Sequence, residues 1–429
     1  DNIELYINGK QVAVTGNGLD YDLLKEIPQE VANTLKPTGN ILAAHCRNNG
    51  GGAYVDMGIM KKVKRGDTFD DKAIQTSATV MPTQTYYTFE CGPVELELIF
   101  TAPMLMDDLE AMTAPYNYIT YQARSLDGRA HDVRLYLEAT PQWAVNTTDQ
   151  LVSFEKIEKD GYVYLKTGSV DQDVLGKKGD NVRIDWGYFW LAAKGDADTS
   201  FIDGSDGMKY AVLKKTVKSG ENALIMFAYD DTESIEYFGK HLRSVWNSKG
   251  KTIEEALADA AEDWVKLERR ADEFSKELRT DATLAGGEKY ADMLSLAWRQ
   301  AIAAHKAVLD ENGELLFISK ECFSNGCAAT VDVSYPSIPM FLIYNPELVI
   351  GMMRPIFRYA ASDDWQYDFA PHDAGRYPLL NGQFYGGGNL PDKQMPVEEC
   401  GNMLVMAATA SIALGNADFA AKHIDTLNT

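Results

Sequence analysis

The hydrophobic period of this chain changes once, and that change is its strongest constraint on the fold. In the first half apolar residues recur at every second position, as in Val94–Leu98 and Val133–Leu137, which is typical of strands with one buried face. Asp127-Gly128 and Asp160-Gly161 follow such runs, and this dipeptide favours the turn of a two-stranded hairpin. Many short strands separated by turns predict an antiparallel β-sandwich domain over residues 1–245.

A helical period begins at Thr252-Ile253-Glu254-Glu255, which has the form of a capping box. Apolar residues at spacings of three and four then predict a long helix, which forms a linker over residues 246–285 and is broken at Gly286-Gly287. Further helix starts are indicated by Asn345-Pro346 and by Pro396.

The helix that starts at Pro396 is expected to end at Gly415, because glycine is favoured just past a helix end. Residues 286–429 therefore predict a helical-hairpin domain. We expect this domain to be incomplete at its C-terminal end, because the last hairpin has only begun at Thr429.

The charge balance limits the class of partner. The chain carries 63 acidic and 41 basic residues, for a net charge of −22 at pH 7. This disfavours nucleic acid and anionic lipid, and it favours a small-molecule substrate. No apolar run approaches the roughly 18 residues that span a bilayer, so we expect no membrane-spanning segment. The first residues do not have the pattern of a signal peptide.

The five cysteines predict no disulfide framework, because they are few and odd in number: Cys46, Cys91, Cys322, Cys327 and Cys400. Cys322 and Cys327 are spaced for a bridge or for half of a metal site, but a metal site would lack its second pair. We expect mainly buried free thiols.

The densest group of functional side chains lies between Trp365 and Met406, where loops rich in Gly and Pro lead into a helix. Glu398 and Glu399 stand in the first turn of that helix, where the helix dipole favours carboxylates. This accounts for one Glu but not readily for two, because neighbouring helical residues project about 100° apart. Once desolvated, such a carboxyl group can serve as a general acid.

His372 lies in a loop beside Asp373, where acidic neighbours would raise its pKa and hold its ring. A lone His is more often a structural donor than a catalyst. Asp332 stands between β-branched residues, which indicates either an edge residue or a buried paired group. A metal site built from His372 and the carboxylates would have no recognisable ligand spacing, so we expect no metal and no cofactor. The candidate catalytic residues are Glu398, Glu399, Asp332, His372 and Asp373.

Aromatic side chains in the same segment, together with amides and carboxylates, fit the recognition of a sugar or an amino acid. Aromatic residues in a loop rich in Gly and Pro more often face a cavity than the core. Asn402 follows Glu398 by four residues and shares its helix face, where it can orient a carboxylate or a substrate. The candidate substrate-binding residues are Trp365, Tyr377, Asn402, Arg376 and Asn325.

Five motifs in a fixed order carry a resemblance to a known family. They are L-A-W-R-Q-A (296–301), S-N-G-C-A-A-T-V-D-V-S-Y-P (324–336), Y-N-P-E-L (344–348), F-A-P-H-D-A-G-R-Y-P (369–378) and M-P-V-E-E-C-G-N-M (395–403). This order resembles the glutaminase A family of secreted or periplasmic proteins. The resemblance covers most of the chain. It implies a β-sandwich followed by the first part of an (α/α)6 toroid of the six-hairpin glycosidase type, and a secreted or periplasmic location.

The resemblance implies an amidohydrolase that converts L-glutamine and water to L-glutamate and ammonia. A second hypothesis is a six-hairpin glycoside hydrolase acting on oligosaccharides, with paired carboxylates as acid and base. Inversion would be supported by carboxyl groups about 6.5–9.5 Å apart. A third hypothesis is a non-catalytic binding protein in which the two glutamates only cap a helix.

Pocket shape separates the first two hypotheses. A small closed pocket with an arginine favours glutamine, and Arg376 and Arg299 are the candidates for that arginine. A long cleft with an aromatic platform favours a sugar. Both enzymatic hypotheses require Asp332, His372 and the Glu398/Glu399 pair to converge.

Overall fold

The computed structural model describes residues 2–16, 25–48, 55, 57–59, 68–321 and 324–428. The chain divides into two compact units, Asp1–Gly66 and Asp67–Thr429. Residues 1–66, which we assigned to the sandwich domain from the sequence, thus form a unit of their own. Cys322 lies outside the described residues. The described cysteines are free thiols, of which Cys327 is buried and Cys91 is exposed.

The described part of the first unit is built on a small antiparallel sheet in the order β2-β1-β3. Its elements are β1 (Asn2–Ile7), β2 (Lys10–Val14), α1 (Gln29–Ala32) and β3 (Leu42–Arg47). Asn8 and Gly9 both have positive φ, which is the conformation that a two-residue β1–β2 hairpin turn requires.

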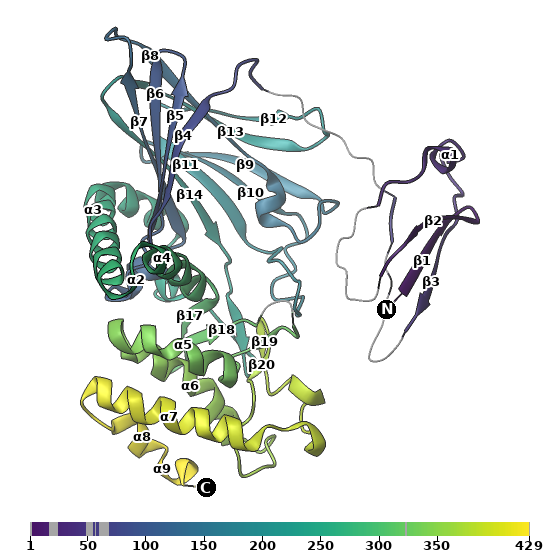
Figure 1. Cartoon of the computed structure of the whole chain (residues 1–429), viewed down its shortest axis with the longest axis vertical. Coiled ribbons are helices and arrows are strands. Elements are labelled where there is room, and N and C mark those ends of the chain that lie inside the picture. Colours follow the sequence, from purple (N-terminus) through teal and green to yellow (C-terminus); the bar gives the residue numbers. More distant parts are fainter. Residues whose placement is uncertain are drawn as a thin grey trace. The chain divides into compact units, whose positions relative to one another are not determined.

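The second unit begins with the predicted β-sandwich (Figure 1). Within the described residues its larger sheet has the order β4-β5-β6-β7-β14-β11-β10-β9, and its smaller sheet has the order β12-β13-β8. The strands are β4 (Ile74–Val80), β5 (Gln84–Cys91), β6 (Val94–Thr101), β7 (Tyr116–Ser125), β8 (Asp132–Ala139), β9 (Val152–Lys159), β10 (Tyr162–Ser169), β11 (Tyr188–Lys194), β12 (Asp198–Asp203), β13 (Lys209–Lys218) and β14 (Asn222–Asp230).

Every strand pair of these two sheets is antiparallel. Alternate side chains of both sheets meet in one apolar core, which includes Ile119, Leu191 and Leu213. The prediction of an antiparallel sandwich is therefore confirmed.

The two Asp-Gly turns have different outcomes. Asp160 and Gly161 have φ values of 51° and 78° and close the predicted hairpin between β9 and β10. Asp127-Gly128 instead leads from β7 of the larger sheet to β8 of the smaller sheet, so the hairpin predicted there is wrong. The Asp127 carboxylate accepts a hydrogen bond from the Arg129 backbone at 2.9 Å. That bond shapes the turn locally but does not decide which sheet the next strand joins.

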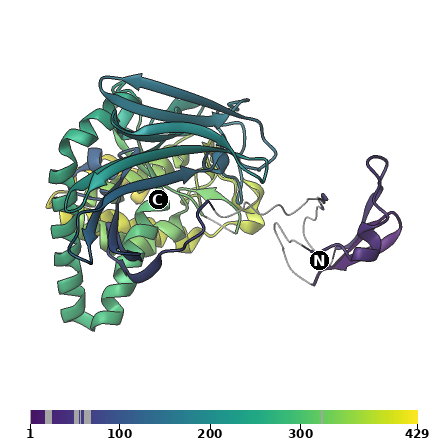
Figure 2. The ribbon, with the colours of Figure 1, turned by 90° about the horizontal axis from the view of Figure 1, so that it is seen from above.

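The long helix α3 (Ile253–Gly286) attaches the helical region to the sandwich, and Figure 2 shows it lengthwise beside the sheets. It starts with the predicted capping box at Thr252. Its buried face packs on the larger sheet, where the Tyr118 hydroxyl donates to the Ala260 carbonyl at 2.9 Å. The next helix, α4 (Glu288–Ala303), adds the Trp298 indole, which donates to the Met104 carbonyl at 3.1 Å.

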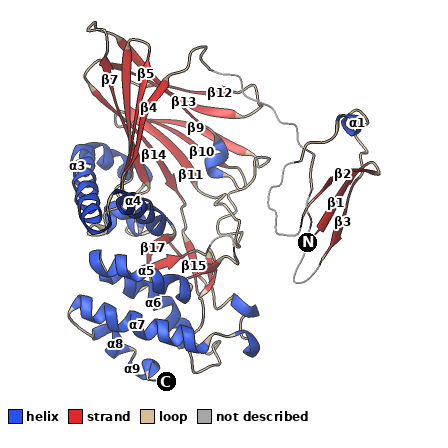
Figure 3. Cartoon of the chain, viewed as in Figure 1, coloured by secondary structure: helices blue, strands red, loops and turns tan. Residues whose placement is uncertain are grey.

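The rest of the second unit is mainly helical, as the colours of Figure 3 show. Its elements are β17 (His305–Leu309), β18 (Leu315–Ser319), α5 (Val331–Tyr344), α6 (Pro346–Ala360), α7 (Pro396–Leu414), α8 (Asp418–Lys422) and α9 (Ile424–Leu427). The predicted starts at Pro346 and Pro396 are confirmed, and Gly415 follows α7 with a φ of 70°. Helices α5, α6 and α7 pack against one another.

A further sheet joins segments that are distant in sequence, in the order β16-β15-β21-β20-β19 among the described residues. Its strands are β15 (Ile235–Tyr237), β16 (Lys240–Leu242), β19 (Cys327–Ala328), β20 (Gly375–Arg376) and β21 (Leu379–Leu380). Ala328 pairs with Gly375, so the chain just before α5 lies beside the chain just after Asp373. The remaining short helices are α2 (Leu109–Met112), η1 (Pro141–Ala144), η2 (Val245–Asn247), η3 (Tyr385–Gly387) and η4 (Pro391–Lys393).

Helix α7 is the one helix in the described part of the chain that is long and apolar enough to cross a membrane by length and composition. This is weak evidence, because core helices meet the same criteria. Its Met403, Met406 and Ala410 side chains are buried in the apolar core of the helical region.

Candidate active site

Two helix starts and one loop meet at a single point of the helical region. Asp332 stands in the first turn of α5, Glu399 stands in the first turn of α7, and His372 lies in the loop before β20. The Val331 backbone N–H donates to the His372 carbonyl at 2.9 Å, which ties the start of α5 to that loop. One oxygen or nitrogen atom from each of Asp332, His372 and Glu399 lies within 4.8 Å of the other two.

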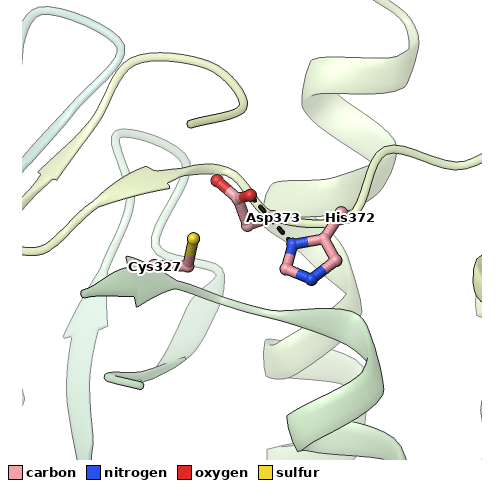
Figure 4. A group of neighbouring side chains, drawn as sticks. All are labelled: Cys327, His372 and Asp373. Carbon is pink, nitrogen blue, oxygen red and sulfur yellow. Dashed lines mark hydrogen bonds and ion pairs between the residues drawn. The ribbon is translucent and has the colours of Figure 1, made fainter. Parts of the chain in front are cut away.

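The His372 ring is buried and fixed on several sides. Its Nδ1 lies 3.0 Å from Asp373 Oδ2, a contact that Figure 4 marks with a dashed line, and its Nε2 lies 3.7 Å from Asp332 Oδ1. Its face stacks on Tyr385 with ring centroids 4.0 Å apart. Burial lowers the pKa of His372, but the Asp373 hydrogen bond and the charges of Asp332 and Glu399 outweigh it and raise the pKa above its ordinary value.

Asp373 is fully buried and is held by the backbone around it. Its Oδ1 accepts hydrogen bonds from the N–H groups of Gly375 at 3.0 Å and Phe384 at 2.8 Å. Its Oδ2 accepts one from the N–H of Tyr385 at 3.0 Å as well as facing His372. This carboxylate therefore orients the imidazole from a rigid position.

Cys327 lies beside Asp373 and is fully buried (Figure 4). Desolvation, together with the nearby Asp373 charge, raises the pKa of the Cys327 thiol far above its ordinary value. A thiol held neutral is a poor nucleophile, so Cys327 has a packing role.

Glu399 is 0% exposed, whereas its neighbour Glu398 is exposed. Neither carboxyl oxygen of Glu399 makes a hydrogen bond of normal geometry to a residue that the structure describes. Desolvation raises the pKa of Glu399 to about 8; Asp332 and Glu398 add to the shift, and His372 and Asn402 oppose it. The buried Oδ1 of Asp332 also lacks a hydrogen bond within the described structure, although 30% of the Asp332 side chain is exposed.

Three of the predicted substrate-binding residues form one connected turn beside Asp373. The Asn325 side chain accepts from the Cys327 N–H at 2.8 Å, and its carbonyl accepts from Arg376 Nε at 3.2 Å. The Arg376 guanidinium also lies over the Phe384 ring, 4.5 Å from its centroid. The Tyr377 N–H donates to the Gly326 carbonyl at 2.9 Å.

The other candidates take separate places. Asn402 is half-buried, one turn after Glu399 on α7. Trp365 is buried in a group of aromatic rings with Tyr359 and Tyr367, and its indole donates to the Phe369 carbonyl at 2.7 Å.

Arg299, the alternative arginine for a substrate carboxylate, faces the sandwich. It donates to the carbonyls of Met81, at 2.7 Å, and Gln84. Arg376 is therefore the one of the two candidate arginines that lies next to the site.

Two site residues were missing from the predicted set. Gln383 is buried, accepts from the His372 N–H at 2.7 Å and donates to the Gly388 carbonyl at 3.0 Å. Tyr385 covers the His372 ring. The position of Tyr385 next to the Gly386–Gly388 run was a usable signal for a residue in a functional loop, whereas nothing in the sequence marks Gln383.

The family comparisons agree with this architecture. Residues 287–429 match the model of the glutaminase A six helical-hairpin domain, and residues 83–221 and 207–281 match a domain of unknown function (DUF5127). The chain is 26% identical to glutaminase A of Aspergillus oryzae over 391 residues. The resemblance to the glutaminase A family that the sequence motifs indicated is thus confirmed over the helical region.

This 26% match covers 82% of the chain and 56% of the Aspergillus protein. A probable glutaminase of Arthroderma benhamiae is 34% identical over 166 residues, which are 38% of the chain and 19% of that protein. The chain thus spans about half the length of the Aspergillus relative. The predicted architecture of a sandwich followed by helices of the six-hairpin domain is confirmed.

Two solved structures also share similarity with this chain. A putative kojibiose phosphorylase from the human microbiome gives a TM-score of 0.37 at 13% identity, over 76% of this chain and 41% of that one. A family GH92 inverting mannosidase of Bacteroides thetaiotaomicron gives a TM-score of 0.36 at 12% identity, over 78% of this chain and 41% of that one.

Proposed function

We propose that this protein is a glutaminase-type amidohydrolase that converts L-glutamine and water to L-glutamate and ammonia. Its reaction centre is the Asp332–His372–Glu399 group. The observation that supports this assignment is the meeting of these three side chains from separate segments. One oxygen or nitrogen atom of each lies within 4.8 Å of the others, and the buried Glu399 carboxyl has no hydrogen bond within the described part of the chain. The glutaminase names of the two relatives supply the reaction class.

The chemistry requires a group that accepts a proton from water and a group that delivers a proton to the departing nitrogen. The water oxygen bonds to the side-chain amide carbon of glutamine, the carbon–nitrogen bond breaks, and the nitrogen leaves as ammonia with the proton that water gave up. Asp332 is the partly exposed member of the group, so water and substrate reach the centre from its side. Arg376, next to Asn325, is the cation nearest in sequence to His372 and suits the substrate carboxylate.

The glycoside hydrolase alternative has less geometric support. An inverting glycosidase keeps its two carboxyl groups about 6.5–9.5 Å apart so that a water molecule fits between them. The nearest oxygen atoms of Asp332 and Glu399 lie within 4.8 Å of each other, which is below that range.

The test is ammonia release from L-glutamine, measured beside a panel of aryl glycosides. We expect Glu399→Gln and Asp332→Asn each to lower kcat/KM for glutamine by at least about 100-fold, because each removes a group that acts on the reacting atoms. Glu288→Gln is the matched control: it removes an exposed carboxylate from the first turn of α4, and its activity should equal that of the wild type. Full glutamine hydrolysis by the Glu399→Gln variant, or turnover of a glycoside in place of glutamine, would contradict the proposal.

A further inference from the structure

We propose that Asp332, His372 and Glu399 bind one divalent transition-metal ion of the Zn²⁺ or Mn²⁺ class. One imidazole and two carboxylates meet here from three separate segments, with one ligand atom of each within 4.8 Å of the others. Imidazole nitrogen suits zinc and its neighbours, whereas carboxylate oxygen also suits manganese. The imidazole ligand disfavours Ca²⁺ and Mg²⁺, which prefer oxygen alone.

The orientation of His372 is that of a metal-binding histidine. Its Nδ1 faces Asp373 at 3.0 Å, so its Nε2 is left to face Asp332. In metal-bound histidines the N–H of the second ring nitrogen commonly donates a hydrogen bond to a carboxylate in this way, which fixes the tautomer and the ring plane. Asp373 is itself held by three backbone N–H groups, and Tyr385 stacks on the ring face. The position and direction of His372 Nε2 are therefore fixed.

An independent observation points to a bound cation. Both oxygens of the fully buried Glu399 lack hydrogen-bond donors within the described structure, and the buried Oδ1 of Asp332 has only the 3.7 Å contact with His372 Nε2. Burying a carboxylate without a partner is costly, so native proteins supply a hydrogen bond, an ion pair or a metal. A cation between these oxygens and His372 Nε2 supplies both Glu399 oxygens with a partner and bridges them to Asp332 Oδ1.

The separation of the ligand atoms and the exposure of Asp332 also fit a catalytic type of zinc site. Zinc–ligand bonds of about 2.0–2.2 Å place the ligand atoms of a tetrahedral site about 3.3–3.6 Å apart. His372 Nε2 and Asp332 Oδ1, at 3.7 Å, already stand close to that separation. Three protein ligands leave a fourth position for water or substrate, as catalytic zinc sites do. The partly exposed side chain of Asp332 places this open position on the solvent side of the group.

A second donor cluster, formed by Cys327, His372 and Asp373, is a poorer candidate. The Asp373 oxygens already accept backbone hydrogen bonds from Gly375, Phe384 and Tyr385. A metal there would have to displace those bonds and the contact with His372. A metal in the Asp332–His372–Glu399 group would displace no hydrogen bond of Asp332 Oδ1 or of the Glu399 oxygens among the described residues.

The sequence prediction of no metal rested on ligand spacing. Each ligand lies in its own segment, so no short spacing exists to be recognised. The proposed metal site does not depend on glutamine being the substrate.

The experiment is metal binding by the full chain after treatment with a chelator, measured without substrate. Isothermal titration with ZnCl₂ and with MnCl₂ should give one ion per chain, Zn²⁺ the tighter in line with the general affinity order, and each ion should raise the Tm. Substitution with Co²⁺ should give the visible absorption of a low-coordinate site with nitrogen and oxygen ligands.

Variants locate the site. Glu399→Gln and Asp332→Asn should each weaken the binding by at least about 100-fold, and Asp373→Asn by about 10- to 100-fold through the loss of ring orientation. Glu288→Gln should bind as the wild type does. Glu399→Gln keeps the side-chain shape and adds no buried charge, so the metal-free variant should melt no lower than the metal-free wild type. A wild type that binds neither ion, or equal affinity in Glu399→Gln and Asp332→Asn, overturns the proposal.

The two proposals fail separately. One-to-one binding that is lost in the variants, without hydrolysis of glutamine, keeps the metal site and rejects the glutaminase assignment. If the metal-free chain hydrolyses glutamine, needs Glu399 to do so and binds no ion in the titration, the glutaminase assignment is kept and the metal site is rejected.

Discussion

Glu398 and Glu399 are neighbours in sequence, yet only Glu399 is buried. Helix geometry separates their directions by about 100°, so the packing of α7 places one inward and leaves the other in solvent. The sequence indicated that both could not share one environment, but it did not indicate which one faces α5. That choice depends on the packing of α5 and α7, which lie far apart in sequence.

The two glutamates should therefore respond differently to the same substitution. We expect Glu399→Gln to lower glutamine hydrolysis by at least about 100-fold and Glu398→Gln to lower it by only a few-fold, since an exposed charge acts on the centre weakly through solvent. Values of kcat/KM for the two variants, measured side by side, test this. Equal losses would show that the exposed residue also takes part directly.

Asp373 is predicted to be the residue of the site that matters most for stability. Asp373→Asn puts an amide NH₂ where backbone N–H groups now find an acceptor, so at least one buried donor loses its partner. We expect the free energy of unfolding to fall by about 2–3 kcal/mol, measured by urea denaturation. Asp332→Asn is the comparison, because Asp332 Oδ1 accepts no hydrogen bond within the described structure. A loss as large in Asp332→Asn would contradict the explanation.

At the scale of elements, short-range signals predicted starts and turns well. The capping box at Thr252, the prolines that open α6 and α7, and the Asp160-Gly161 hairpin all formed as predicted, because each depends on residues within one turn of chain. The hairpin predicted at Asp127-Gly128 did not form, because turn chemistry does not specify the sheet that receives the next strand. Trp365 was assigned to a binding surface from its loop context, but its ring is buried among other aromatic side chains, which depends on the fold.

The capping box of α3 offers a test at this scale. Thr252 Oγ1 accepts from the Glu255 N–H at 3.3 Å, and Glu255 accepts from the Thr252 N–H at 2.9 Å. Thr252→Ala should reduce the free energy of unfolding by about 1 kcal/mol. Thr252→Ser should keep most of this contribution, because serine retains the capping hydroxyl. A Tm series of the three proteins checks this, and an equal loss in Thr252→Ser would exclude the hydroxyl as the cause.

At the scale of the molecule, the sandwich and the helical region of residues 67–429 share buried contacts. Thr83 donates to the Ala271 carbonyl at 3.0 Å, Tyr118 to the Ala260 carbonyl and Trp298 to the Met104 carbonyl. Such shared contacts could not be predicted from the sequence, because each joins residues more than a hundred positions apart. Periodicity indicated two types of domain but not how one packs on the other.

These contacts predict that the sandwich and the helices unfold together. All seven tryptophans lie in residues 67–429, so tryptophan fluorescence reports this unit alone. In urea, fluorescence should give a single transition that coincides with the loss of helical circular dichroism. Arg299→Met, which removes the donors to the Met81 and Gln84 carbonyls, should shift both signals equally. Two separated transitions would show that the regions are independent.

The stacking of Tyr385 on His372 has a consequence for the thermodynamics of binding. The imidazole is held between an aromatic face and the Asp373 carboxylate, so its rotamer is already selected before any ligand arrives. A ligand that meets this ring does not have to immobilise it, and the conformational entropy of that side chain is not lost again on association. Replacing Tyr385 with a small residue would free the ring, so that the same contacts would form with a larger entropic penalty and a lower affinity.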